Sequence, residues 1–245
     1  IGLENCGHIG RIVVDPTDAN RLFVAATGTL YGKNNERGIY RSSDGGANWE
    51  QVLFVSDSTA LIDVVMNPVN PDILFAAAWE RTRFPWIRDY GGVTSGVYRS
   101  LDGGDTWTKL GNGLPISDED TGRIGLAIST SNPNSIYASY TTNSITNVFD
   151  GLYKSEDNGE NWIEITLGQI DNVNYTFGWY FGNVRVHPED ENDVFVLGQR
   201  LYRGDFTIGA YQEITQMHVD HHALEISKNN PDFMVEGNDG GLYLS

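Results

Sequence analysis

Residues 42–49 read Ser42-Ser43-Asp44-Gly45-Gly46-Ala47-Asn48-Trp49, and this octapeptide returns twice in altered form. The second copy is Ser100-Leu101-Asp102-Gly103-Gly104-Asp105-Thr106-Trp107, and the third is Ser155-Glu156-Asp157-Asn158-Gly159-Glu160-Asn161-Trp162. Trp107 follows Trp49 by 58 residues, and Trp162 follows Trp107 by 55. A repeat with a period of this length indicates a solenoid, a propeller or another array of similar units.

The shared pattern, Ser-x-Asp-x-Gly-x-x-Trp, has the chemistry of a turn between two antiparallel strands. The aspartate can accept hydrogen bonds from backbone N–H groups of the turn, the glycine permits a positive φ, and the tryptophan anchors the returning strand. Short apolar or aromatic runs flank each copy, which is typical of paired strands. We therefore predict a structural role for twelve residues: Ser42, Asp44, Gly46, Trp49, Ser100, Asp102, Gly104, Trp107, Ser155, Asp157, Gly159 and Trp162.

Each octapeptide lies in a longer repeat that predicts four short strands. The repeat begins with an apolar run, a turn rich in Pro, Asn and Asp, and a second apolar run, as in residues 11–26. Four antiparallel strands make one blade of a β-propeller. The sequence therefore predicts an all-β fold and a single propeller domain, residues 1–245, with blades at approximately 8–53, 61–110, 122–167, 181–214 and 221–245.

The fifth blade is predicted to be incomplete, because Ser245 would be the first residue of another octapeptide. About four and a half blades indicate part of a larger ring, since propellers typically close with four to eight. Uncovered sheet edges invite aggregation. We therefore expect the remaining blades, or another chain, to cover the open edges of the first and last blades.

The octapeptide resembles the Asp-box, also called the bacterial neuraminidase repeat. This repeat occurs in sialidases, some xyloglucan-cleaving glycosidases, sortilin-type receptors and a photosystem assembly factor. The whole chain is most similar to uncharacterised secreted bacterial members of this group, on its Gly-Arg-Ile, Asp-Gly-Gly-x-x-Trp and His-x-Asp-x-His segments. The resemblance implies a β-propeller that is secreted, periplasmic or on the cell surface, and it specifies function poorly.

The composition and net charge of the chain limit the classes of partner that it can bind. The chain has 245 residues and a net charge of −17, which disfavours binding to nucleic acid or to an anionic membrane surface. No apolar run approaches the roughly 18 residues that a membrane-spanning helix needs. The acidity is spread over turns, and we expect either a soluble surface or a divalent cation site.

The long, non-repeating loops of one face are the expected place of binding, because long loops on a rigid scaffold commonly carry function. Aromatic residues are frequent in these loops, and aromatic faces beside carboxylates suit sugar rings or peptide side chains. From these loops we predict three ligand-binding residues: Trp86, Tyr90 and Trp179.

A second group of candidates lies where the first strand of each blade begins. We predict that Arg11, Asp63, Arg123 and Arg185, with His218, Asp220 and His222 of the fifth repeat, surround the mouth of the central channel. They either pair with one another as structural salt bridges or hold an anionic or sugar ligand. Alternate residues of a strand share a face, so His218, Asp220 and His222, with Asp239, could also hold a divalent cation.

The sequence favours a binding module without catalysis, which takes a glycan or a protein or peptide ligand on the long-loop face. The alternative is a glycoside hydrolase, sialidase-like or xyloglucanase-like, which needs two carboxylates about 5–9.5 Å apart. Asp63, Asp220 and Glu80 are the catalytic candidates. A third hypothesis is a structural module of an extracellular assembly.

Overall fold

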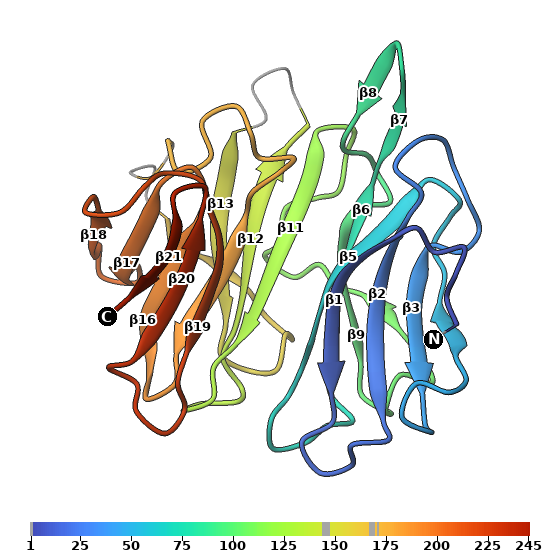
Figure 1. Ribbon diagram of the computed structural model, residues 1–245, viewed down its shortest axis with the longest axis horizontal. Coiled ribbons are helices and arrows are strands. Elements are labelled where there is room, and N and C mark those ends of the chain that lie inside the picture. Colours follow the sequence, from blue (N-terminus) through green and yellow to red (C-terminus); the bar gives the residue numbers. More distant parts are fainter. Residues whose placement is uncertain (1, 144–147, 167–169, 171) are drawn as a thin grey trace. The chain divides into compact units, whose positions relative to one another are not determined.

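The computed structural model describes residues 2–143, 148–166, 170 and 172–245. Within these residues every regular element is a β-strand, which confirms the predicted all-β class (Figure 1). The described part of the chain contains no helix that could span a membrane. The chain forms two compact units, residues 1–111 with 115–124 and residues 112–114 with 125–245.

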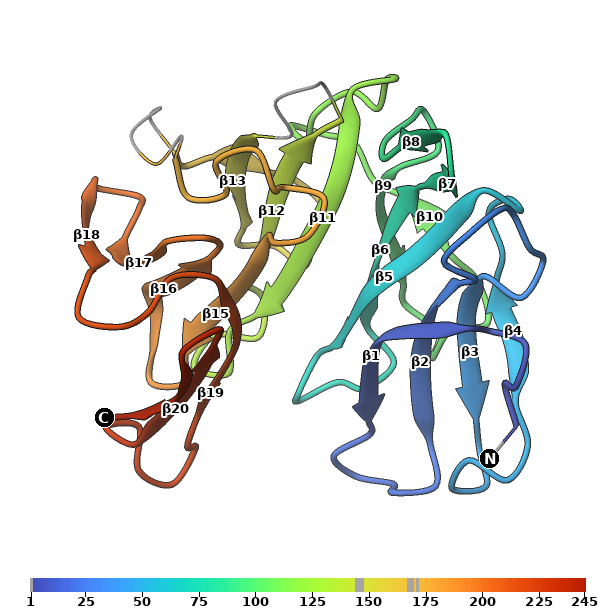
Figure 2. The ribbon, with the colours of Figure 1, turned by 45° about the horizontal axis from the view of Figure 1, so that its top comes forward.

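The first unit contains two complete sheets, each with its strands in chain order (Figure 2). The strands of the first sheet are β1 (His8–Val14), β2 (Leu22–Gly28), β3 (Gly38–Ser42) and β4 (Glu50–Leu53). Those of the second are β5 (Thr59–Met66), β6 (Leu74–Glu80), β9 (Gly96–Ser100) and β10 (Thr108–Lys109). Neighbouring strands in both sheets run antiparallel.

The third sheet begins where the units meet in sequence, since β11 (Thr121–Ile128) starts in the first unit and ends in the second. It continues with β12 (Ile136–Thr142), β13 (Phe149–Ser155) and β14 (Ile163–Glu164). The fourth sheet consists of β15 (Asn183–His187), β16 (Asp190–Leu197), β17 (Leu201–Asp205) and β18 (Ala210–Ile214). The fifth has three strands, β19 (His221–Ile226), β20 (Met234–Asn238) and β21 (Gly241–Leu244).

The described residues thus hold five small sheets of the propeller-blade type, where the sequence indicated about four and a half. One further element was not predicted. The connection from β6 to β9 contains a two-stranded ribbon, β7 (Thr82–Phe84) and β8 (Ile87–Asp89), which projects from the second sheet (Figure 1). A three-residue strand gives little periodic signal, so the sequence alone showed only a long loop.

Each unit buries its apolar side chains between adjacent sheets. In the first unit Phe23 and Ala25 of β2 pack with Leu61 and Val64 of β5, and all four are fully buried. In the second unit Val184 and Val196 of the fourth sheet belong to a similar core cluster. A buried side chain of this kind stabilises the fold by roughly 1.5–3 kcal/mol.

The three octapeptide turns share one hydrogen-bond network. In the second copy Ser100 Oγ donates to Asp102 Oδ1 at 2.8 Å and accepts from the backbone N–H of Gly104 at 2.9 Å, while Thr106 N donates to Asp102 Oδ1 at 2.9 Å. The other two turns repeat these bonds within 0.1 Å. Hydrogen bonds to the carboxylate from position +4 and from the serine lower the pKa of Asp102 to about 2.

Candidate functional site

Aromatic residues and carboxylates line a pocket of about 280 Å³ in the second unit. Its residues come from four connections: the one before β15, the β16–β17 loop, the one before β19 and the β20–β21 loop. They are Phe177, Trp179, Tyr180, Phe181, Gln199, Asp220 and Asp239. Because β15 and β19 begin where β16 and β20 end, these four connections lie at one end of their sheets. We call this group the aromatic pocket.

Backbone hydrogen bonds hold the loops of the aromatic pocket. The N–H groups of Tyr180 and Phe181 both donate to the carbonyl of Phe177, at 2.8 and 3.0 Å. Asp220 N donates to the carbonyl of Gln199 at 3.0 Å. This bond joins the segment that precedes β19 to the β16–β17 loop of the fourth sheet. Asp220 has a φ of +68°, a left-handed conformation that only a few per cent of non-glycine residues adopt. Such a residue in a pocket wall is a reason to consider a functional role.

In the pocket wall, aromatic rings adjoin a contact between a histidine and an aspartate. The ring of His222 stacks on Phe181, with centroids 5.5 Å apart and an interplanar angle of 25°, and meets Tyr180 edge-on at 5.4 Å. His222 Nε2 lies 2.7 Å from Asp239 Oδ1. Trp179 packs beside Tyr180 with ring centroids 5.4 Å apart. Flat faces for apolar contact therefore adjoin carboxylates that can accept hydrogen bonds from hydroxyl groups.

The structure does not assemble the predicted metal site. Asp220 lies before β19 with a left-handed backbone, and of the three predicted ligands in residues 218–222 only His222 is inside the strand, so the expected alternation fails. His218 Nδ1 lies 2.9 Å from the carbonyl oxygen of Val219. Among the described residues no three His, Cys, Asp or Glu side chains form a group that could hold a metal ion.

The other catalytic candidates lie in the first unit and are held by neighbours. Arg11 Nε donates to Asp63 Oδ1 at 2.9 Å, and the Asp63 side chain is only 5% exposed. Glu80 Oε2 accepts from the N–H and the hydroxyl of Thr94, at 3.1 and 2.7 Å. Arg11 and Asp63 therefore form one of the salt bridges that the sequence suggested, between the first strands of two sheets.

The two remaining arginines also lie on first strands. The Arg123 guanidinium lies 6.0 Å from the centroid of the Trp79 ring in the first unit. In the second unit Arg185 donates to the carbonyl of Leu224 at 3.2 Å and to that of Val184 at 2.8 Å. Arg185 thus contacts the backbone of the neighbouring β19.

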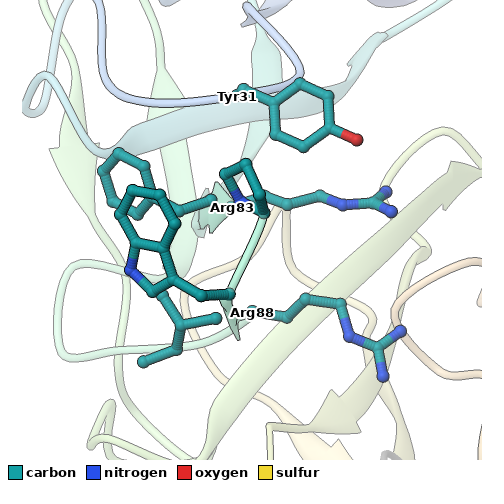
Figure 3. Close-up of a pocket in the computed structure, with 7 residues that line it drawn as sticks. Tyr31, Arg83 and Arg88 are labelled. Atoms are coloured by element: carbon teal, nitrogen blue, oxygen red, sulfur yellow. The ribbon is translucent and has the colours of Figure 1, made fainter.

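The first unit contains two aromatic residues that we predicted to bind a ligand, Tyr90 and Trp86, and their environments differ. Tyr90 is only 5% exposed, and its carbonyl accepts a hydrogen bond from Trp79 Nε1 at 2.5 Å. The ring of Tyr90 is turned inward against Trp79, with ring centroids 5.7 Å apart, and its role as a ligand-binding residue stays a prediction. Trp86 at the tip of the β7–β8 ribbon is 80% exposed. It stacks on Phe84 at 5.5 Å and lines a pocket of about 320 Å³ (Figure 3).

Two buried contacts that hold these loops together were not predicted from the sequence: one between His221 and Glu236, and one between Arg37 and three loops. His221 Nδ1 lies 2.7 Å from Glu236 Oε1, and both side chains are buried. Arg37 is 1% exposed and donates to the carbonyls of Gly32, Ser58 and Arg81, at 2.6 to 2.9 Å. It thereby joins three loops at the base of the β7–β8 ribbon. The repeat pattern gives no signal for either, because each depends on loop geometry specific to one blade.

No family model matches this chain. A xyloglucanase of Paenibacillus sp is 29% identical over 113 residues, which cover 41% of this chain and 10% of that protein. The crystal structure of an ancestral GH74 enzyme has a TM-score of 0.67 and 19% identity, and covers 97% of this chain and 30% of that one. The GH74 xyloglucanase of Xanthomonas campestris has a TM-score of 0.65 and 18% identity, with 96% and 36% covered.

A third solved structure, YCF48 bound to D1 peptide, has a TM-score of 0.57 and 14% identity, and covers 100% of this chain and 65% of that one. At these identities the likeness establishes the fold, a β-propeller, and no activity. The chain spans a tenth of the length of the curated relative that it matches and about a third of the two GH74 enzymes.

Proposed function

We propose that this chain is part of a glycoside-hydrolase-like propeller that acts on a β-glucan of the xyloglucan type. The aromatic pocket is the observation that supports this proposal most directly. It places Trp179 and Tyr180 beside the carboxylates of Asp220 and Asp239 within about 280 Å³. The likeness to xyloglucanases in sequence and in fold supports the same substrate class.

In this proposal the sugar rings pack on the aromatic faces, and the carboxylates accept hydrogen bonds from ring hydroxyls. Hydrolysis of a glycosidic bond needs one carboxylic acid to protonate the leaving oxygen and one carboxylate to act as base or nucleophile. Asp220 and Asp239 are the pair we assign to these roles. His222, at 2.7 Å from Asp239, orients that carboxylate.

Glycan binding without hydrolysis is the second candidate. It is favoured by the state of the carboxylates: Asp239 is engaged by His222, Asp63 by Arg11 and Glu80 by Thr94. A carboxylate that is already held has less freedom to exchange a proton with a substrate. In that case the aromatic pocket retains the polysaccharide and leaves it intact.

Release of reducing ends from soluble xyloglucan separates the two candidates. We expect the chain to release them, and we expect Asp220→Asn and Asp239→Asn each to lower the rate by about 10²-fold or more. The matched control is Asp232→Asn, which makes the same change at an exposed site beyond the opposite end of β19. Release unchanged in both pocket variants would exclude the assigned pair, and binding without release would favour the second candidate.

A further inference from the structure

The aromatic pocket of the second unit has two carboxylates and no basic side chain among the described residues that line it. Asp220 directly precedes His221, Asp239 directly follows Asn238, and His221 and Asn238 are register partners in β19 and β20. The two carboxylates therefore lie at the same end of one strand pair and in the wall of one pocket. A cleft lined by one sign of charge attracts ligands of the opposite sign.

The Asp220 carboxylate has no charged partner in the part of the chain that the structure describes, and no side chain there donates a hydrogen bond to it. Its backbone N–H, in contrast, is held by the carbonyl of Gln199. Asp239 differs, because His222 Nε2 lies 2.7 Å from its Oδ1. Asp220 is therefore the carboxylate that is available to a cation from outside the chain.

The arginine next to the pocket in sequence is engaged elsewhere. Arg200 Nη1 donates to Glu213 Oε2 at 2.8 Å, and Nη2 donates to the hydroxyl of Tyr175. The guanidinium also lies 5.1 Å from the centroid of the Tyr175 ring. Neither Glu213 nor Tyr175 belongs to the described lining of the pocket. Because Glu213 compensates its charge, Arg200 does little to offset the negative potential of Asp220.

Aromatic rings form most of the remaining wall of the pocket. Phe177 and Tyr180 are 42% and 52% exposed, and Trp179 lies beside Tyr180 with ring centroids 5.4 Å apart. The face of an aromatic ring attracts a cation that lies within about 6 Å of its centroid. The same face suits the apolar side of a sugar ring. Aromatic rings beside a carboxylate therefore fit a protonated amine that is carried on a sugar.

We propose that the aromatic pocket prefers a β-1,4-linked glucosamine residue, whose ammonium group pairs with Asp220 while its ring packs on Trp179 or Tyr180. This inference rests on the proposed function, because it takes the pocket to be a sugar site, and it adds the charge of the preferred sugar. Glucosamine has an amine in place of the hydroxyl at carbon 2 of glucose, so it keeps the shape of a β-glucan residue. Its charged amine makes a stronger hydrogen bond to a carboxylate than a neutral hydroxyl does.

Isothermal titration of the unaltered chain with three tetrasaccharides tests this preference. They are cellotetraose, the β-1,4-linked tetramer of glucosamine and the fully N-acetylated form of that tetramer, compared at a mildly acidic pH at which the amines are protonated. We expect the glucosamine tetramer to bind at least about tenfold more tightly than cellotetraose, because its hydrogen bond to the carboxylate is charge-assisted. The neutral N-acetylated form should lose this advantage, and rising salt should reduce it.

Two matched variants test whether the preference comes from the pocket. Asp220→Asn should lower the ratio of the two affinities, glucosamine tetramer over cellotetraose, by at least about fivefold, because it removes the charge and keeps the shape of the side chain. Asp232→Asn removes one exposed carboxylate beyond the opposite end of β19 and should leave the ratio unchanged. Trp179→Ala should weaken the binding of both tetrasaccharides, because both rings pack on the same face.

Three results would overturn the proposal. The first is equal affinity of the unaltered chain for the glucosamine tetramer and cellotetraose. The second is an equal fall of the ratio in Asp220→Asn and Asp232→Asn, which would assign the preference to the net charge of −17. The third is equally tight binding of a tetralysine peptide, which carries the charge without the sugar rings. Binding of cellotetraose without a preference contradicts this inference alone, whereas no binding of any tetrasaccharide contradicts the proposed function as well.

Discussion

The aspartates of the octapeptide turns are exposed, yet each accepts several hydrogen bonds that stabilise its turn. Asp44 and Asp102 are on the surface, yet each accepts hydrogen bonds from a serine hydroxyl, a backbone N–H and the side chain at position +4. These bonds favour the charged form and lower both pKa values to about 2. The pattern Ser-x-Asp-x-Gly-x-x-Trp predicted these turns because every partner lies within four residues of the aspartate.

The first prediction concerns acid stability. Because the folded-state pKa of Asp102 is below its ordinary value of 3.8, its contribution to stability is present above about pH 4 and is lost as pH falls towards 2. We expect Asp102→Asn to lower the thermal midpoint at pH 7. Between pH 4 and pH 2 the thermal midpoint of this variant should fall by less than that of the unaltered chain. Circular dichroism melts measure both. An equal fall in Asp102→Asn and the unaltered chain would contradict this, with Asp232→Asn as the control.

At the scale of elements, the fourth sheet lacks the octapeptide and stabilises its last turn differently. Between β17 and β18, Asp205 Oδ1 accepts from Thr207 N at 2.8 Å. Phe206 is 1% exposed and stacks on Tyr211 at 4.6 Å, with an interplanar angle of 12°. An aromatic side chain thus anchors the returning strand here, as the tryptophan was predicted to do in the octapeptides.

Removal of this anchor gives a second prediction. Phe206→Ala should lower the free energy of unfolding by about 3–5 kcal/mol, because it empties a filled site in the core of the second unit. Ile208→Ala, two residues away at a side chain that is 76% exposed, should stay within about 0.5 kcal/mol. Urea denaturation provides both values. A cost below about 1 kcal/mol for Phe206→Ala would show that the turn does not depend on this ring.

Some features at the scale of elements could not be predicted from the sequence. The strands and turns followed from local patterns that repeat, but the β7–β8 ribbon and the burial of Tyr90 did not. Tyr90 is placed by contact with Trp79, eleven residues away, and Arg37 by three loops that meet only in the folded unit. The sequence named Trp179, Asp220 and His222 as candidate ligand-binding residues, and it also offered Asp220, His222 and Asp239 as candidate ligands of a metal. Only the left-handed backbone at Asp220 shows why they do not converge on one.

For the whole molecule, the aromatic pocket of the second unit lies on connections between strands, while the octapeptide turns are short and alike. That function belongs to the long-loop face stays a prediction, made because long loops on a rigid scaffold commonly carry function. The likeness in fold to the two GH74 enzymes covers nearly all of this chain but a minor part of each enzyme. We therefore propose that the aromatic pocket contacts sugar and that the octapeptides have a structural role.

The most direct test of this account is isothermal titration of the chain with xyloglucan oligosaccharides. We predict saturable binding, and at least a tenfold higher Kd, equivalent to about 1.4 kcal/mol, for Trp179→Ala because it removes an aromatic face of the pocket. Phe233→Ala, an exposed aromatic beyond the other end of β19, should bind like the unaltered chain. No saturable binding, or equal affinity for all three proteins, would contradict the assignment of the aromatic pocket to a glycan.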